Sequence, residues 1–188
     1  MRKIILASQS PRRRELLKDI TDEFSVVPSN CDETVPEDIN PHDIPQFLAL
    51  MKAKDVAKSY ENDIVIGSDT IVIVDNEVLN KPKDEEDAKQ MLRKLSHRRH
   101  SVVTGCALVC GEKSHSFSVE TEVEFFKLTE EEIDKYVLSG DPMDKAGAYG
   151  VQSKGKTLVK GIYGDYFNVV GLPVGRLKRE IETFIENL

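Results

Sequence analysis

The stretch Ile4–Leu17, IILASQSPRRRELL, constrains the fold more than any other part of the chain. It begins with an apolar run, Ile4–Ala7, that is typical of a buried strand. Helical spacing follows at once, with Ser10 as the expected N-cap and Pro11 in the first helical position, where the missing N–H of proline costs nothing. The stretch therefore predicts a buried strand, a tight turn and a helix.

Three arginines, Arg12, Arg13 and Arg14, stand in the first turn of this expected helix. The helix dipole already places positive charge there, so each cation is unfavourable by roughly 0.3–1 kcal/mol. Backbone N–H groups, serine hydroxyls and guanidinium groups together make a receptor for phosphate. Solvent-exposed arginines with no ligand are an equally open interpretation. If Arg13 serves only a ligand, its removal should slightly stabilise the free protein.

Composition excludes several classes of protein. The 188 residues carry a net charge of −7, which opposes a nucleic-acid-binding role for the basic clusters. No apolar run approaches the roughly 18–20 residues of a membrane span, and the N-terminus lacks the apolar region of a signal peptide. The three cysteines, Cys31, Cys106 and Cys110, have neither CxxC nor metal-finger spacing. These features predict a cytoplasmic protein that binds neither membrane nor nucleic acid.

A second apolar run, Ile64–Ile66, predicts another buried strand, which Gly67 is expected to break. Ligands of open α/β sheets bind beyond the carboxyl ends of the strands, so Ser8 and Asp69 would share one edge. An aspartate in this position is also a common turn former, and that alternative stays open. On local grounds Glu33 is an ordinary solvated residue of a loop. Lys52 is expected on the solvated face of a helix over 41–60.

The remaining pattern predicts an α/β protein with a mixed, bent sheet, because its long hairpins exclude a simple doubly wound order. Asp75-Asn76 fits a hairpin turn, and Thr129-Glu-Glu-Glu132 fits a capping box. Further elements are expected as a helix over 84–95 and strands over 101–110 and 115–126. A last helix over 174–184 is expected to turn Leu177, Ile181, Phe184 and Ile185 inward.

Six blocks in register carry a resemblance to a known family: LASQSPRRRELL, GSDTIV, LNKP, HSVVTG, DPMDKAGAYGVQ and GDYFNVVGLP. In this order they resemble the Maf family of nucleotide pyrophosphatases, from Ile4 to about Pro173. The resemblance implies an inosine-triphosphatase-like fold, as a single domain over 1–188 with two lobes around a deep active-site cleft. One departure is His97, which stands where the family usually has glycine.

The resemblance also implies metal-dependent cleavage of nucleoside triphosphates to monophosphate and pyrophosphate. Ser8, Arg12 and Arg13 match the family's phosphate-binding turn. The family's catalytic acids and lysines match Glu33, Lys52, Asp69 and Lys81. Gln152, with Thr70 and Arg12, resembles the branch acting on dTTP and UTP. A homodimer is family-like, and a nucleotide-binding regulator of septum formation with little turnover is the alternative function.

Physical chemistry assigns roles to these residues. Mg²⁺ prefers one or two carboxylates together with phosphate oxygens and waters, so Asp69 and Glu33 suffice to hold Mg²⁺ or Mn²⁺. Asp69 is the candidate to orient or deprotonate the attacking water, with the metal lowering the pKa of that water. No histidine or cysteine stands in a nucleophile arrangement, which favours direct attack by water over a covalent intermediate. The amide of Gln152 matches the C=O and N–H pair of uracil or thymine. Pairing of Gln152 with the backbone of its own glycine-rich segment is the competing interpretation.

Overall fold

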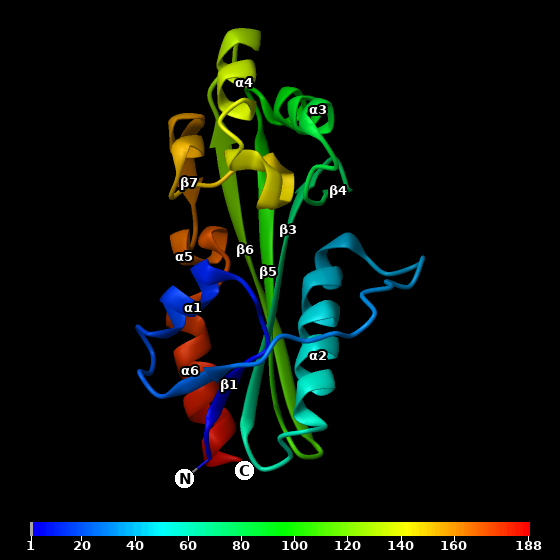
Figure 1. Cartoon of the computed structure of the whole chain (residues 1–188), viewed down its shortest axis with the longest axis vertical. Coiled ribbons are helices and arrows are strands. Elements are labelled where there is room, and N and C mark those ends of the chain that lie inside the picture. The colour runs from blue at the N-terminus through cyan, green and yellow to red at the C-terminus, as the bar shows by residue number, and fades with distance from the viewer. Residues whose placement is uncertain (1) are drawn as a thin grey trace. The chain divides into compact units, whose positions relative to one another are not determined.

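Seven strands form a mixed sheet in the computed structural model, which describes residues 2–188 (Figure 1). They pair in the order β2-β1-β3-β5-β6-β7, and β4 pairs with β3 outside this path. The strands are β1 (Ile4–Leu6), β2 (Phe24–Val26), β3 (Ile64–Val74), β4 (Glu77–Leu79), β5 (Arg99–Cys110), β6 (Lys113–Phe125) and β7 (Val159–Tyr163). The helices are α1 (Pro11–Leu17), α2 (Ile44–Ala57), α3 (Glu85–Leu95), α4 (Glu130–Val137), α5 (Tyr166–Val170) and α6 (Val174–Glu186). This mixed α/β architecture confirms the predicted fold class.

The chain divides into two compact units, each built from separate segments of the sequence. Unit 1 combines the chain up to Asp69 with Thr104–Val119 and Gly171–Leu188. Unit 2 combines Thr70–Val103 with Glu120–Val170. None of the helices among residues 2–188 is both long and apolar enough to cross a membrane.

The first turn of unit 1 forms as the sequence predicts. β1 pairs in parallel with β2 and with β3, and its residues Ile5 and Leu6 are buried. The side chain of Ser10 caps α1 by accepting a hydrogen bond from the backbone N–H of Arg13, and Pro11 is the first helical residue. The helix then ends at Leu17, one turn earlier than the apolar spacing suggests.

The prediction that Gly67 breaks the second strand is wrong. β3 runs without interruption from Ile64 to Val74, so Asp69 lies within the strand and not after it. It is β1 that ends, at Leu6, while the neighbouring β3 continues. The glycine serves helix packing instead: a Cβ at Gly67 would lie 2.0 Å from the carbonyl oxygen of Ala49 in α2.

Helix α2 turns a partly different face to the sheet from the expected one. Of the expected apolar stripe, Ile44, Phe47, Leu48, Met51 and Val56, only Leu48 and Val56 are buried. Ala49 and Ala53 are fully buried, whereas Phe47 and Met51 are only half-buried. Small residues face the sheet here because the helix approaches β3 closely, and Gly105 of β5 likewise has no room for a Cβ beside Pro45. Because the two alanines occupy the closest contact with the sheet, the larger Phe47 and Met51 lie to the side of it and are only half-buried.

The hairpins and caps of unit 2 confirm the remaining local predictions. Asp75 and Asn76 adopt φ angles of 52° and 61°, as a tight hairpin turn between β3 and β4 requires. Thr129 and Glu132 form the complete capping box of α4. In unit 1, however, Ile185 of α6 is 47% exposed, so its predicted inward orientation is wrong.

The structure also explains the departure at His97. This residue has a φ of 59°, in the left-handed region where glycine is favoured. Its backbone N–H donates to the carbonyl oxygen of Phe126 at 3.0 Å, which holds the turn between α3 and β5 in place. The imidazole is exposed, so the histidine is accommodated without a clash in the core.

Substitution of Gly67 tests the close packing of α2 on the sheet. We expect Gly67→Ala to lower the free energy of unfolding by about 2 kcal/mol or more, because the added methyl overlaps a backbone carbonyl. Gly175→Ala is the matched control. Its Cβ would meet only a flexible arginine end on the surface of α6, so helix propensity should stabilise the protein by about 0.5–1 kcal/mol. Chemical denaturation of both variants measures the difference, and equal stabilities would contradict the packing argument.

Candidate active site

A lysine bridges two carboxylates in unit 1. The ammonium group of Lys52 lies 2.7 Å from Oδ1 of Asp69 and 3.1 Å from Oε2 of Glu33. The side chains of Lys52 and Asp69 are each only 13% exposed, whereas Glu33 is 56% exposed. Three predicted site residues that are widely separated in the sequence thus meet in one cluster. Glu33 forms its solvent-exposed side.

Three different elements bring these groups together. Asp69 projects from β3, and Lys52 comes from α2, whose close approach to Gly67 sets its position. Lys52 is therefore not the solvated helix residue that local spacing suggests. Glu33 lies in the loop that joins β2 to α2, and its ion pair with Lys52 ties that loop to the site.

Asp55, one helical turn beyond Lys52, is a positioning residue that the sequence analysis did not identify. Its carboxylate accepts hydrogen bonds from the hydroxyl of Ser29 at 2.9 Å and from the backbone N–H of Asn30 at 3.1 Å. These two hydrogen bonds lower the pKa of Asp55 below its ordinary value. Ser29 and Asn30 lie near the start of the loop that carries Glu33. Helix α2 therefore holds this loop at two points, at Ser29 and Asn30 through Asp55 and at Glu33 through Lys52. No local pattern in the sequence points to this role, because the i, i+3 spacing of Asp55 only matches Lys58, with which it forms an ion pair at 3.5 Å.

Arg13 connects the first helix to the same region. Its Nε donates to the carbonyl oxygen of Gly171 at 2.9 Å, and one terminal nitrogen donates to the carbonyl oxygen of Ser68 at 2.9 Å. The same nitrogen donates to the hydroxyl of Ser8 at 3.2 Å. Burial lowers the pKa of Arg13, and the nearby carboxylate of Asp69 opposes that shift. Arg13 and Ser8 therefore form a hydrogen-bonded cluster beside Asp69, which two backbone carbonyl oxygens hold in place.

Cys106 lies against this cluster. Its thiol contacts the hydroxyl of Ser68 at 3.9 Å and is fully buried. Burial raises the pKa of the Cys106 thiol to about 12, although Ser68 and Arg13 oppose the shift. A thiol that stays protonated is a poor nucleophile, which agrees with direct attack by water.

Of the other predicted site residues, Arg12 lies half-buried on α1 in unit 1, and the remaining three belong to unit 2. Thr70 lies on β3 and is half-buried, whereas Lys81 and Gln152 are exposed on loops. The two loops are joined by a hydrogen bond from the backbone N–H of Gly147 to the carbonyl oxygen of Asn80, at 3.1 Å. Within unit 2, the segment before Lys81 thus contacts the segment that leads to Gln152.

The donor set around Lys52 fits a hard divalent cation. Among residues 2–188 there is no group of three or more His, Cys, Asp or Glu side chains that could hold a metal ion by themselves. Asp69 and Glu33 supply oxygen atoms that already share one cation, the Lys52 ammonium. Two carboxylates completed by phosphate oxygens and water are what Mg²⁺ accepts.

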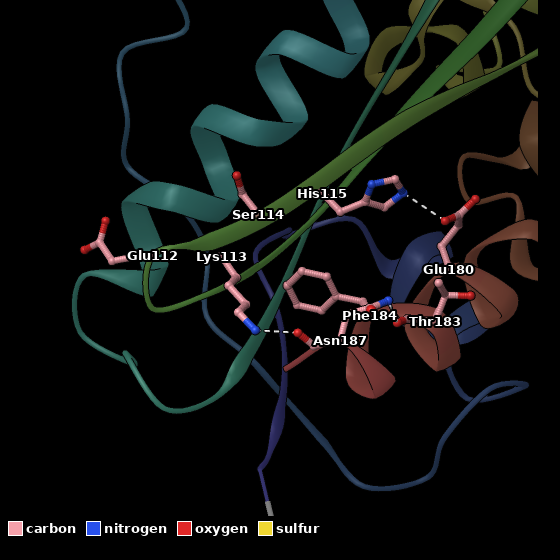
Figure 2. A pocket seen from close by; sticks show the side chains of 8 residues that line it. All are labelled: Glu112, Lys113, Ser114, His115, Glu180, Thr183, Phe184 and Asn187. Atoms are coloured by element: carbon pink, nitrogen blue, oxygen red, sulfur yellow. Dashed lines mark hydrogen bonds and ion pairs between the residues drawn. The ribbon is translucent and has the colours of Figure 1, made fainter.

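A pocket of about 480 Å³ in unit 1 contains none of the predicted residues. Figure 2 shows its lining, where Lys113 donates to the backbone of Asn187 and His115 contacts Glu180 at 2.8 Å. Glu180 also pairs with Arg176 at 2.5 Å. Lys113 is thus bound to a backbone carbonyl oxygen, while His115 and Arg176 share Glu180. Two acidic residues, Glu112 and Glu180, line the pocket, which disfavours a triphosphate there.

The fold defines an α/β protein of the inosine-triphosphatase-like class. The solved structure of the Staphylococcus aureus Ham1 protein is similar over 96% of this chain and 98% of that chain, with a TM-score of 0.58 at 17% identity, and thus shows the fold alone. The family model described as Maf-like protein matches residues 3–184. The chain belongs to the Maf family, which confirms the resemblance predicted from its sequence blocks.

Curated relatives are similar over nearly the whole chain. The dTTP/UTP pyrophosphatase of Bacillus mycoides (strain KBAB4) is 52% identical over 98% of this chain and 96% of its own length. The protein of the same name from Bacillus cereus (strain B4264) is 51% identical over the same shares.

The contacts of Arg13 reverse one expectation from the sequence. We expect Arg13→Ala to lower the free energy of unfolding of the ligand-free protein by about 2–4 kcal/mol, because two carbonyl oxygens and a hydroxyl lose a charged donor. Arg14→Ala, an exposed neighbour on the same helix, should change it by less than about 0.5 kcal/mol. Urea denaturation without nucleotide compares the two variants. A stabilised Arg13→Ala protein would restore the view of Arg13 as a ligand-only residue.

Proposed function

We propose that this chain is a nucleoside triphosphate pyrophosphatase that hydrolyses dTTP and UTP to the monophosphate and pyrophosphate. The observation that carries the proposal is the cluster in which Lys52 holds Asp69 and Glu33 beside Arg13. A protein that only binds polyphosphate has little use for carboxylates there, because they repel the ligand. An enzyme needs them to handle water and a cation. The names of the curated relatives support the same activity and the same substrates.

The charges of the cluster suit a triphosphate, which carries roughly four negative charges. Arg12 and Arg13 of the first helical turn would bind phosphate oxygens, and Lys52 would pass from its carboxylate partners to the phosphates as substrate enters. Lys81 would add a further positive charge. Ser8 would orient Arg13, to which its hydroxyl is bound in the free protein.

Asp69 is the proposed catalytic residue for the attacking water. Its carboxylate is mostly buried, pairs with the Lys52 ammonium at 2.7 Å in the free protein and projects from the middle of β3, whose strand pairing fixes it also when Lys52 turns to the phosphates. A fixed carboxylate can accept a proton from water, or orient that water in line with the phosphate. Glu33, on the open side of the cluster, completes the acidic pair.

We also propose that Asp69 and Glu33 hold a divalent cation, Mg²⁺ or Mn²⁺, when substrate is bound. Such a cation lowers the pKa of bound water and neutralises the charge that develops on phosphate oxygens. The support for this assignment is the donor set, two carboxylates already arranged around one positive group.

Gln152 and Thr70 are proposed to recognise the base. The amide of Gln152 offers one donor and one acceptor, which match the imide edge of uracil and thymine. Gln152 is exposed and therefore accessible to a ligand.

The wider assignments follow from the family. We propose that the chain functions as one domain, since the family model runs through segments of both units. A cytoplasmic location, where nucleoside triphosphates are made, and a homodimeric assembly complete the proposal. Size-exclusion chromatography with light scattering measures the latter directly.

Removal of one carboxylate charge tests the catalytic assignment. We expect Asp69→Asn to lower kcat by about 10² or more, because the amide keeps the shape but neither accepts a proton nor holds a cation as well. Asp75→Asn is the matched control, because Asp75 lies in an exposed hairpin turn with a φ of 52° that asparagine adopts readily. Released pyrophosphate is measured. Activity of Asp69→Asn within a few-fold of the wild type would remove Asp69 from the centre.

A panel of nucleotides tests the substrate assignment. UTP and dTTP should exceed CTP at least about tenfold in kcat/KM, because cytosine reverses the hydrogen-bonding pattern that Gln152 matches. Gln152→Glu should reduce this preference, since a carboxylate loses the donor. Product analysis must show pyrophosphate and the monophosphate. Equal rates on UTP and CTP would indicate that Gln152 pairs only with its own backbone, and nucleotide binding without hydrolysis would favour the regulatory alternative.

A further inference from the structure

Gln152 lies at the exposed tip of a loop in unit 2 whose two ends are in contact. A Cβ at Gly155 would lie only 2.7 Å from the carbonyl oxygen of Gly150, so the backbone closes on itself at these two glycines. Val151 is buried and Ser153 is half-buried on either side of the exposed glutamine. The direction of Gln152 is therefore set by what holds residues 150–155.

One carboxylate, that of Asp141, holds this loop. Its Oδ2 accepts a hydrogen bond from the hydroxyl of Ser153 at 2.6 Å and another from the hydroxyl of Tyr136 at 2.8 Å. Its Oδ1 contacts the ammonium group of Lys145 at 3.3 Å. Asp141 thus joins helix α4, the segment before the loop, and the residue directly after Gln152.

The ionised form of Asp141 is stabilised by its hydrogen-bond donors, although the side chain is only 16% exposed. Burial raises the pKa of Asp141, but the hydrogen bonds from Ser153, Tyr136 and Lys145 outweigh burial and leave it below its ordinary value. Hydrogen bonds to an ionised acceptor are roughly twice as strong as neutral ones. A fixed anion is therefore a better anchor for this loop than a neutral amide would be.

The segment on the other side of Gln152 is also anchored. Tyr149 is buried and lies edge-on to the rings of Phe125 and His100, with centroid distances of 4.7 and 5.4 Å. Its hydroxyl forms a hydrogen bond of 2.7 Å with Nε2 of His100. The chain on both sides of the loop is thus fixed, and the Asp141–Ser153 contact is the one that is adjacent to Gln152.

We propose that Asp141 is a positioning residue for base recognition, which acts through the hydroxyl of Ser153 to hold the side chain of Gln152 in the orientation that reads the imide edge of uracil or thymine. The inference rests on the proposed function, in which Gln152 contacts the base. It adds a specificity determinant that touches neither the base nor the phosphates.

The variant Ser153→Ala tests this inference because it removes one hydroxyl and leaves Gln152 and the Asp141 charge in place. We expect the ratio of kcat/KM for UTP to that for CTP to fall about fivefold, as for the loss of one charge-assisted hydrogen bond. The fall should arise from UTP, with CTP nearly unchanged. Ser101→Ala is the matched control: its hydroxyl likewise donates to a carboxylate of unit 2, Oε1 of Glu120 at 2.5 Å, but on the sheet and outside the loop. The control should leave the ratio unchanged.

A double-mutant cycle separates positioning from a general loss of stability. In a Gln152→Ala background, Ser153→Ala should have no further effect on the UTP/CTP ratio, since no amide remains to be oriented. An equal fall in both backgrounds would overturn the proposal. An unchanged ratio in Ser153→Ala, with only a lower melting temperature, would overturn it as well.

Amide hydrogen exchange gives a readout that does not depend on activity. Ser153→Ala and Asp141→Asn should both increase exchange at residues 150–155, whereas Ser101→Ala should not. If the wild-type protein releases no pyrophosphate from any nucleotide, the proposed function fails, and exchange still decides whether Asp141 holds the loop. Unchanged exchange in both variants would overturn the positioning role, whatever the activity.

Discussion

The close approach of helix α2 to strand β3 is the constraint on which the candidate site depends. Gly67 and Ala49 touch backbone to backbone, which brings the helix nearer to the sheet than larger side chains would allow. At that separation the Lys52 ammonium reaches the carboxylate of Asp69 within the strand. The same helix carries Asp55, which fixes the start of the Glu33 loop. The single contact between Gly67 and Ala49 thus brings Lys52 of α2 within reach of Asp69 of β3, and Lys52 in turn binds Glu33.

The arginine in the first turn of α1 shows how a locally unfavourable charge can be favourable in the fold. The helix dipole opposes a cation at the position of Arg13. Two carbonyl oxygens from β3 and from the start of the last segment offset that cost, because each accepts a hydrogen bond from the guanidinium group. Arg13 of α1 therefore links strand β3, through Ser68, to the last segment of unit 1, through Gly171. Its charge remains beside Asp69.

The residues proposed to act on the phosphates lie in unit 1 apart from Lys81, and those proposed to recognise the base lie in unit 2. Asp69, Glu33, Lys52 and Arg13 lie in unit 1, whereas Thr70, Lys81 and Gln152 lie in unit 2. Each set has its own support: helix packing in unit 1, and the Asp141 anion in unit 2. Substitutions that alter the preference between pyrimidines should therefore leave the Lys52–Asp69–Glu33 cluster of unit 1 in place.

The sequence by itself determined the local structure, because caps, hairpin turns and periodic burial depend on neighbouring residues. Ser10 and Pro11, Asp75-Asn76 and the Thr129 capping box all form as their local chemistry dictates. The sequence blocks also identified the family. Only the tertiary structure decided that β3 continues through Gly67, that Lys52 is withdrawn from solvent and that Arg13 binds carbonyl oxygens. These three outcomes depend on groups far apart in the chain, and their distances in space are set by packing that no local pattern contains.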